Sequence, residues 1–496
     1  MNQSLSQRNC IIYLAVVFAS ISTVAAPSPA SAGLLNDWLR KESEAMKAWD
    51  IGGEIRLRYV NSEGAVSTGP IMTATPSGTK PLTTPVNANN DFIGKGKINS
   101  TEELLLREKF HVGYTPASWF TVFGEFRNSD AYWDERHPSP NQDSTDLHQA
   151  YLALGDPKLF PLMGIFGRQV LNYGDRRLIG DPPWLNNGRT FDAAKLRFVT
   201  DAFWVDAFVG HQVVPWQDHF NRSNTDDLLY GICASTDKLL PWQETQLYFF
   251  ARSANSNAIS SVDTLVPGTP TTARDIYIPG IRFKSLPGKL CGWDYALEIA
   301  GQFGNCYDTT LKRRLDKEAY AVFANVGYTW TNVWASPRLG VGYEGGSGDS
   351  NPKDGKSGTF DSFFGAIHQY YGQMDLFGYR NLHIPRVGVA LAPLKNLVLT
   401  VDYLNFWLAD TNDYLYPASG SGRSSNGYGI NPTYDSYVGS ELDVVVKYSP
   451  LSWLKLEAGY GHFFVGDYIK QSVGSVPANG SAVDANWFYV QTMLIF

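Results

Sequence analysis

Apolar and polar residues alternate along most of this chain, in short stretches separated by polar segments. The end of the chain, "ANWFYVQTMLIF", shows the pattern: Phe488, Val490 and Leu494 share one parity, while Trp487 and Tyr489 share the other. A period of two is typical of a β-strand that presents two different faces. Soluble domains usually end in a polar tail, so an apolar, aromatic last stretch predicts a strand that is packed against a neighbour.

Similar alternation predicts eighteen strands, an even number, as expected for a bacterial outer-membrane barrel. The predicted strands are 50–60, 102–114, 119–128, 147–154, 163–170, 192–199, 203–212, 228–235, 244–252, 275–284, 293–304, 318–329, 337–343, 383–391, 397–408, 440–448, 455–464 and 485–496.

The connections between these strands alternate between short and long. Short links such as "TPASW", "TDA", "APLKN" and "SPLSW" contrast with long polar segments. The long segments are 61–101, 129–146, 171–191, 213–227, 253–274, 343–382 and 409–439. This asymmetry predicts an all-β fold, a transmembrane antiparallel up-and-down β-barrel with short periplasmic turns and long extracellular loops. Trp119, Trp334 and Trp453, in or beside the short turns, are expected to form one aromatic girdle.

Composition supports a barrel and excludes a helical membrane protein. Charged residues make up 18% of the chain and aromatic residues 14%, the mean hydropathy is -0.21, and no long apolar run follows residue 26. Residues 1–32 have the pattern of a cleaved signal peptide, with Arg8, an apolar core and an Ala30-x-Ala32 site. Without it, 40 basic residues face 48 acidic ones, a net charge of -8. The expected location is the outer membrane of a Gram-negative bacterium.

Residues 33–49 predict a short amphipathic helix, with a periplasmic cap, a plug and a linker all left open, and residues 50–496 are assigned to the barrel. All the short turns are compact, so any gate is expected in an outer loop or in this helix. The three cysteines after the signal peptide have no metal or redox spacing. No metal, cofactor, catalytic constellation or nucleic-acid partner is expected.

Strand parity assigns the residues that line the lumen, because the side chains opposite the apolar face point inward. The basic residues placed inside are Arg56, Arg58, Arg107, Lys109, Arg127, Arg168, Lys195, Arg197, Arg252, Arg282, Lys284, Arg338, Arg386 and Lys447. The acidic ones are Glu54, Glu125, Asp206, Asp294, Glu298, Glu344, Asp402, Glu441, Asp443 and Glu457. Glu108 falls on the lipid side, where a bulge or a rim position is needed to accommodate it.

Positive charge is therefore enriched in the predicted lumen of a chain with a negative net charge. Arginine presents a planar fork that binds carboxylates in a bidentate way and stays ionised. This pattern predicts an anion-attracting pore, in which the acids keep binding shallow. The alternative is that these charges only neutralise one another in a solvated lumen.

Three segments resemble the alginate-export family of outer-membrane barrels. They are "GRQVLNYGDRRLIGDPPWLNNGRTFDAAKLRF", "GTFDSFFGAIHQYYGQMDLF" and "ELDVVVKYSPLSWLKLEAGYGHFFVGDYIK". The resemblance runs from about residue 50 to residue 496 and implies a monomeric barrel of eighteen strands. It also implies passive passage of an anionic polysaccharide, alginate, or of related solutes.

The resemblance implies an arginine-rich constriction, mapped here by strand parity onto the predicted lumen residues. Arg176, Arg177 and Arg189 lie in the connection between the fifth and sixth predicted strands, where they either narrow the pore or decorate its outer rim. The expected partners are an anionic oligo- or polysaccharide, outer-membrane lipid and lipopolysaccharide, and the assembly machinery. A porin for small anionic nutrients and an occluded, surface-binding barrel remain alternatives.

Overall fold

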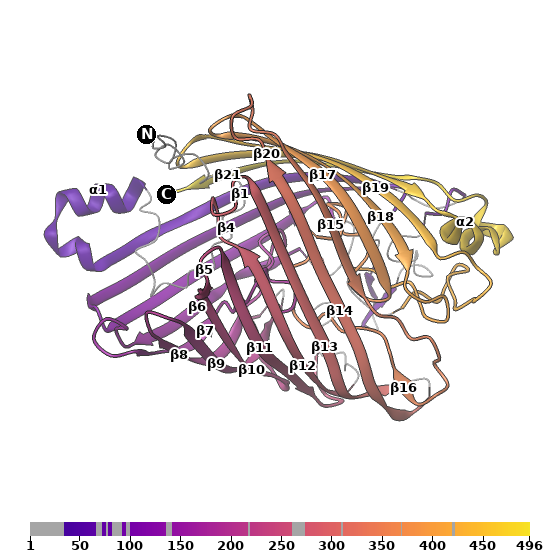
Figure 1. Cartoon of the computed structure of the whole chain (residues 1–496), viewed down its shortest axis with the longest axis horizontal. Helices are drawn as coiled ribbons and strands as arrows, with labels where there is room; N and C mark the ends of the chain where they lie inside the picture. The colour runs from indigo at the N-terminus through magenta and orange to yellow at the C-terminus, as the bar shows by residue number, and fades with distance from the viewer. Residues whose placement is uncertain are drawn as a thin grey trace, which may run out of the picture.

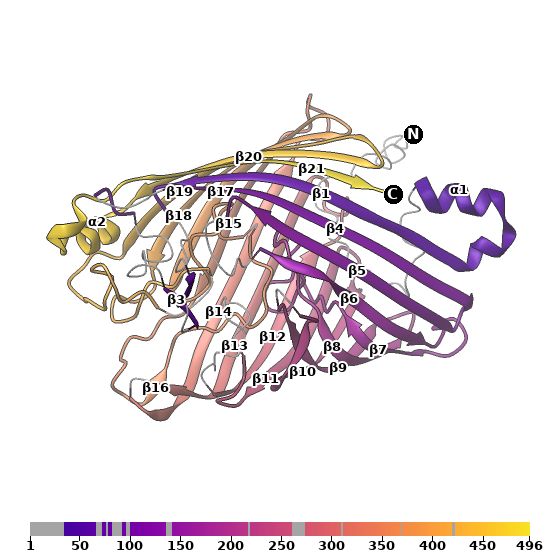
Figure 2. The ribbon, with the colours of Figure 1, turned by 180° about the vertical axis from the view of Figure 1, so that it is seen from behind.

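The chain forms a closed antiparallel β-barrel, seen from two opposite sides in Figures 1 and 2. The computed structural model describes residues 34–65, 72–75, 78–81, 92–95, 100–134, 141–216, 219–259, 273–308, 311–368, 370–418 and 422–496. The predicted signal peptide lies outside the described residues.

Eighteen long strands form the wall of the barrel in the part of the chain that the structure describes. They are β1 (Trp49–Glu63), β4 (Ser100–Ala117), β5 (Phe120–Tyr132), β6 (Asp143–Leu154), β7 (Leu162–Gln169), β8 (Phe191–Val199), β9 (Trp204–Val214), β10 (Arg222–Leu240), β11 (Gln243–Ala254), β12 (Arg274–Ser285), β13 (Trp293–Asp308), β14 (Arg313–Thr329), β15 (Arg338–Gly346), β17 (Leu382–Leu394), β18 (Leu397–Leu408), β19 (Tyr437–Leu451), β20 (Leu454–Val465) and β21 (Ala485–Ile495).

The predicted fold class and strand number are confirmed. Each predicted strand overlaps one observed strand, and neighbours in sequence pair in antiparallel order. The final strand, β21, pairs with β20 on one side and with β1 on the other, which closes the ring. The packed last stretch predicted from its alternation is therefore a wall strand whose two edges are both paired.

Alternation also sorts the two faces of the wall as predicted. Outward positions carry exposed apolar side chains such as Leu57, Val209 and Val326, as a lipid-facing band requires. Trp119 and Trp334, beside short turns, are 54% and 80% exposed.

Glu108 lies on the outward face, between Leu106 and Phe110 on β4. The register of β4 with β5 is continuous through this position, so a bulge does not explain it. The outward Asn128 amide donates to Glu108 Oε2 at 3.4 Å and to Asp130 Oδ2 at 2.8 Å. Polar neighbours on the adjacent strand therefore accompany this carboxylate.

Short helices and strands decorate the two ends of the barrel. They are α1 (Leu34–Glu42), the 3-10 helix η1 (Glu44–Ala48), β2 (Met72–Thr75), β3 (Gly78–Pro81), β16 (Lys356–Ser357), α2 (Asp467–Gly474) and the 3-10 helix η2 (Pro477–Asn479). Helix α1 lies at the end of the barrel that carries the short turns, and α2 lies at the opposite end (Figure 1). The buried Asn36 ties α1 to the start of β1 through Asp50 Oδ1 at 2.6 Å. No helix among the described residues is long and apolar enough to cross a membrane.

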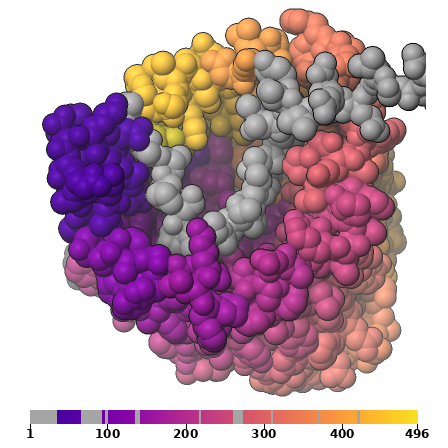
Figure 3. Space-filling view, turned by 60° about the vertical axis from the view of Figure 1, so that its left-hand side comes forward, coloured from indigo at the N-terminus to yellow at the C-terminus, as the bar shows by residue number. Residues whose placement is uncertain are grey.

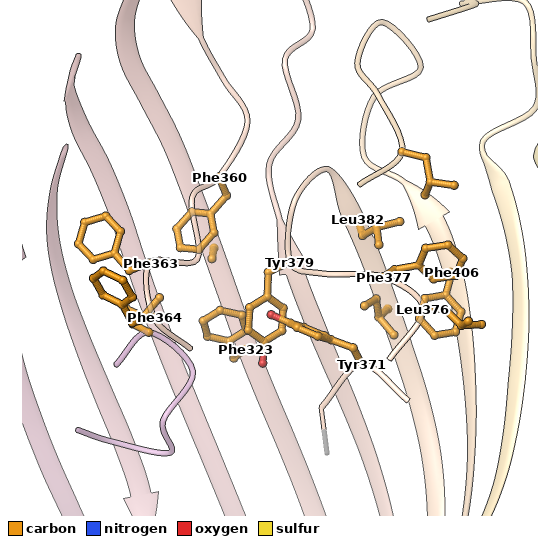
Figure 4. Close-up of a cluster of buried hydrophobic side chains, with 14 of the residues drawn as sticks. Phe323, Phe360, Phe363, Phe364, Tyr371, Leu376, Phe377, Tyr379, Leu382 and Phe406 are labelled. Atoms are coloured by element: carbon orange, nitrogen blue, oxygen red, sulfur yellow. The ribbon is translucent and has the colours of Figure 1, made fainter. Parts of the chain in front are cut away.

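The hydrophobic core lies inside the barrel, because two long connections fold into the lumen. We call residues 170–190, between β7 and β8, the crossing loop, and residues 347–381, between β15 and β17, the aromatic loop. Phe364, Tyr371, Phe377 and Tyr379 of the aromatic loop are at most 1% exposed. They pack against inward side chains of the wall such as Phe323 (Figure 4).

Candidate pore and its constriction

The crossing loop begins on the wall around β9 to β15. The ring of Tyr173 stacks on Phe208 with centroids 4.9 Å apart. Asp175 accepts from Arg282 Nη2 at 2.6 Å and from Lys284 Nζ at 2.7 Å, both on β12. Buried ion pairs of this kind fix the position of a segment, because leaving either charge unpaired is costly.

Arg177 is the most heavily bonded residue of this part of the loop. Its guanidinium makes a bidentate contact with Glu344 of β15, at 2.9 and 2.8 Å, and donates to Asp175 at 3.1 Å. It also lies over the ring of Tyr370, 4.1 Å from the centroid. Arg177 is 2% exposed, so it serves the packing of the loop and not the water-filled lumen.

The same loop then reaches β1, β4 and β5. Arg56 Nη1 and Arg107 Nη1 donate to the carbonyl of Pro183 at 2.7 and 3.1 Å, and Arg58 Nη1 donates to the carbonyl of Trp184 at 2.8 Å. Because β12 stands halfway around the ring of eighteen strands from β1, the crossing loop spans the lumen from one wall to the opposite one.

Asn186 fastens the far end of the crossing loop. Its amide nitrogen donates to the backbone carbonyls of Leu106, Asp130 and Asn141, at 3.1, 3.2 and 2.9 Å, and its Oδ1 accepts from Arg56 Nη2 at 3.0 Å. Ser129 Oγ donates to the Asn186 carbonyl at 2.9 Å. This end of the loop is held by hydrogen bonds to wall backbone as well as to arginines.

The crossing loop and the aromatic loop are joined to each other. Backbone hydrogen bonds run from Phe364 N to Leu178 O at 2.9 Å and from Gly180 N to Phe364 O at 3.0 Å. Arg189 donates to the carbonyls of Gly180, Phe364 and Gly365. Burial lowers the pKa of Arg189 to about 10, so the group is still a cation at neutral pH.

An aromatic stack marks a second meeting point of the two loops. The rings of Trp184 and His368 are parallel within 6°, with centroids 4.0 Å apart. The guanidinium of Arg58 also lies over the ring of Trp184, 3.4 Å from its centroid. Tyr489 of β21 packs edge-on against the same ring, with the centroids 4.9 Å apart. Cation–π and stacking contacts together hold the tryptophan against the wall.

On its other side the aromatic loop rests on two buried carboxylates of β19. Glu441 Oε1 accepts from Met374 N, and Asp443 Oδ2 accepts from Gln373 N, both at 3.0 Å. Near β12, Asp361 pairs with Arg274 at 2.7 Å. Burial alone would raise the pKa of Asp361. The charges of Arg274 and of neighbouring cations instead hold this pKa well below its usual range.

Most predicted pore residues lie on the inward face but are already bonded to protein groups. The wall residues with inward side chains are Arg56, Arg58, Arg107, Lys109, Arg127, Lys195, Arg197, Arg282 and Arg386. Arg127 pairs with Asp143, Arg197 with Asp206, Lys109 with Glu125 at 3.7 Å and Arg386 with Asp402 at 3.7 Å.

Arg168 is the exception, and its predicted inward position is wrong. It shares the face of the exposed Leu162 and Phe166, while Met163 and Ile165 point inward and are buried. On this outward face Arg168 forms a bidentate pair with Asp192 at 2.8 and 3.1 Å. Both faces of β7 carry apolar side chains, since the inward Met163 and Ile165 belong to a small buried cluster. Alternation alone therefore does not show which face of β7 points inward.

Arg176 and Lys195 differ from the other basic residues. Among the described residues, neither side chain has a hydrogen bond or an ion pair with a protein group. Arg176 is half-buried on the crossing loop and has a positive φ of 65°, while its carbonyl accepts from Ala366 N at 2.8 Å. A non-glycine residue held in the left-handed region marks a backbone position fixed by its surroundings.

Arg177 and Arg189 are buried and bonded to groups inside the barrel, and Arg176 is half-buried beside them. Sequence reasoning missed Trp184 and Asn186 and the backbone carbonyls between them, which receive the wall arginines. Their only sequence signal is that they belong to the "GDPPWLNNGRT" segment that carries the family resemblance. No group of three His, Cys, Asp or Glu side chains in the described ranges could hold a metal ion.

A closed barrel with an apolar outer band, and with loops folded into a charged lumen, defines the class of outer-membrane channels. The family model described as alginate export matches residues 83–482. The chain belongs to the alginate export family, which places it in the outer membrane of Gram-negative bacteria.

Solved structures show the same fold at low sequence identity. OpdQ of Pseudomonas aeruginosa is 12% identical, with a TM-score of 0.52, over 91% of this chain and 97% of that one. OccAB3 of Acinetobacter baumannii is 10% identical, with a TM-score of 0.54, over 90% and 99%. The outer membrane protein OpdK of Pseudomonas aeruginosa is 11% identical, with a TM-score of 0.52, over 90% and 99%. No curated protein matches the sequence.

Proposed function

We propose that this channel lets acidic oligo- or polysaccharides such as alginate diffuse passively across the outer membrane. The observation that carries the proposal is the family match over residues 83–482, and inward-facing arginines such as Arg282 and Arg386 support it. A guanidinium holds a carboxylate in a planar, two-point contact and stays charged at any physiological pH. Clustered cations raise the local concentration of anionic solute at the pore.

The residues that support this function best are those whose charge is not consumed by packing. Arg107 and Arg197 have side chains 5% and 4% exposed and are locked in ion pairs, so they stabilise the constriction. Arg176, which is half-buried, and Arg386, with 24% of its side chain exposed, are the stronger candidates for touching solute. A single chain forms a closed barrel, so we propose a monomer in contact with outer-membrane lipid and lipopolysaccharide.

A porin for small anionic nutrients is the second candidate. The observation that favours it is the crossing loop, which divides the lumen between opposite walls and suits a small solute better than a bulky chain. Both functions predict anion preference, and they differ in the size of the solute that enters.

The test is single-channel recording of the refolded full chain in a planar bilayer. A salt gradient gives the reversal potential, and oligomannuronates of increasing length are then added, with neutral malto-oligosaccharides of matched length as the control. Anion preference with block by the longer uronates supports the polysaccharide channel. Block by monomers and dimers alone supports the small-acid porin, and a barrel that does not conduct contradicts both and favours a surface-binding role.

The Arg176→Gln variant sharpens the assignment of the site. We expect it to weaken uronate block about tenfold or less, since one guanidinium–carboxylate contact contributes about 1 kcal/mol in a solvated site. Unchanged block in Arg176→Gln, together with intact anion preference, would assign recognition to other lumen cations.

A further inference from the structure

One strip of the inward wall is built from glycines. Inward positions on β14, β15 and β17 are occupied by Gly327, Gly340, Gly342 and Gly388. A side chain added at Gly342 would meet Arg386 Cγ at 3.0 Å and Cδ at 3.3 Å. The space above this glycine is thus taken by the flat-lying stem of a neighbouring arginine.

The other glycines of the strip show the same arrangement. Gly327 and Gly340 both lie under the guanidinium of Arg338, and Gly388 lies under the carboxylate of Asp402. Glycine at these positions removes side-chain volume from the wall and lets charged side chains lie along it. We call these four glycines the glycine strip.

Three ion pairs lie on the strip or beside it, and they are among the more water-exposed charges of the lumen. Arg338 contacts Asp294 at 2.6 Å, with side-chain exposures of 21% and 39%. Arg386 contacts Asp402 at 3.7 Å, with 24% and 28%. Lys447 of β19 contacts Glu457 at 3.4 Å, with 60% and 21%. We call these three pairs the charged track.

The arginines of β1 contrast with the charged track. Arg56 and Arg58 are 1% and 2% exposed and donate to carbonyls of the crossing loop. Water, and therefore a hydrated solute, reaches the track but not these buried groups. The space-filling view shows a hollow at the short-turn end of the barrel, and the yellow C-terminal strands form part of its border (Figure 3).

We propose that the passage through the barrel follows the glycine strip, and that the charged track binds the carboxylates of acidic sugar units in succession. A solute carboxylate takes the place of Asp402 on Arg386, or of Glu457 on Lys447. The displaced acid then competes with the solute for the cation, so that the solute binds weakly enough to be released. The identity of the sugar rests on the proposed function, whereas the course of the passage does not.

The course of the passage is tested in potassium chloride alone, so its outcome does not depend on any sugar. We expect Gly342→Leu to lower single-channel conductance about twofold or more, because the added side chain and the displaced Arg386 both enter the passage. Gly301→Leu is the matched control: Gly301 lies on the outward face of β13, with no atom within 4 Å of an added Cβ.

Cysteine accessibility keeps the proposal testable if Gly342→Leu fails to fold. The background is Cys291→Ser with Cys306→Ser, which removes the two more accessible free thiols. We expect a charged methanethiosulfonate reagent to reduce the current rapidly in Arg386→Cys and Lys447→Cys. Lys195→Cys, on the opposite wall at a position 6% exposed, is expected to react slowly.

The opposite pattern overturns the proposal. If Lys195→Cys is blocked at once while Arg386→Cys and Gly342→Leu conduct like the unaltered barrel, the passage follows the β8 side. Solute binding is tested separately with oligomannuronate on Arg386→Gln, with the exposed outward Arg314→Gln as control. Equal block in both variants, in a barrel that uronates do block, contradicts the track but leaves the proposed function standing.

Discussion

Two regions of the lumen use arginine in opposite ways. At β1 and β4, Arg56, Arg58 and Arg107 are buried, and each donates to backbone carbonyls of the crossing loop. At β15 and β17, Arg338 and Arg386 lie over glycines and face water with about a fifth of their side chains. Residue type and inward parity are the same in both regions, so it is the loop above them that separates a structural arginine from a solute-facing one.

The comparison also shows where the stability of the constriction resides. A guanidinium that donates to several fixed acceptors in a dry site is costly to remove, because its partners are left unsatisfied. A partly exposed guanidinium whose paired carboxylate lies at 3.7 Å, as in Arg386, is expected to contribute less to stability. Substitutions in the two regions should therefore differ in kind: the first kind disturbs the fold of the lumen, and the second kind alters selectivity.

The largest effect is expected from Arg177→Leu, compared with its neighbour Arg176→Leu. Arg177→Leu leaves Glu344 and Asp175 without a shared cation and should lower the free energy of unfolding by about 3–5 kcal/mol. Arg176→Leu removes a side chain without a protein partner in the described chain and should change it by less than about 0.5 kcal/mol. Urea unfolding of both variants in lipid vesicles measures the difference, and equal losses would mean that the loop is not held by Arg177.

Asp175→Asn is expected to cost about 2–3 kcal/mol, since the acceptor shared by Arg282, Lys284 and Arg177 loses its charge. The unaltered chain also predicts a pH dependence. Burial alone would raise the pKa of Asp175, but Arg282, Arg177 and Lys284 hold it well below its usual range.

A carboxylate with a depressed pKa stabilises the fold fully above its ordinary pKa of about 3.9, and this contribution is lost as the pH falls through the folded value. Asp175 therefore stays ionised between about pH 5 and about pH 8, and it should cause no change in conductance over this range. A constriction that opens between these values in the unaltered chain, and no longer does so in Asp175→Asn, would contradict the assignment.

Trp184→Ala is expected to have an intermediate effect. It removes the contact with Arg58 and the stack on His368, together about 1–2 kcal/mol. Because the tryptophan joins both loops, we expect faster hydrogen exchange at residues 183–186 and noisier single-channel currents. Trp334→Ala, on the outer surface, is the control and should leave the exchange at these residues unchanged.

The smallest effect is expected at the mouth of the track. Lys447→Gln removes a side chain that is 60% exposed and pairs with Glu457 at 3.4 Å, so the unfolding free energy should stay within about 0.5 kcal/mol. The reversal potential in a salt gradient should shift slightly toward cation preference, by less than in Arg386→Gln. A larger shift in Lys447→Gln than in Arg386→Gln would place the main selectivity step at the mouth.

Much of the wall could be predicted from the sequence, because lipid on one side and a polar lumen on the other impose a period of two. The pattern of Glu54, Arg56 and Arg58 against Ile55, Leu57 and Tyr59 leaves one consistent assignment of faces. The pattern fails at β7, where Met163 and Ile165 are buried in a small inward cluster and Arg168 is carried outward.

The contents of the lumen could not be predicted in the same way. The crossing loop has no period, and it accepts the wall arginines with its own backbone carbonyls, which any sequence would offer. Arg176 and Arg177 are adjacent and identical in type, yet Arg177 is buried in an ion-pair network and Arg176 is not. The backbone at Arg176 is also left-handed, a conformation that strand and loop patterns do not reveal.

The crossing loop has a mechanical consequence for the whole molecule. The wall of an empty barrel of eighteen strands is thin, so lateral pressure from the bilayer deforms its cross-section easily. The crossing loop connects β1 and β4 to β12 and β15 across the lumen, and arginines make the contacts at both of its ends. We therefore expect the cross-section of the barrel to be stiff along the diameter that the loop spans. The cross-section should deform more easily at right angles to that diameter. Lateral pressure is therefore expected to change the width of the lumen beside the crossing loop.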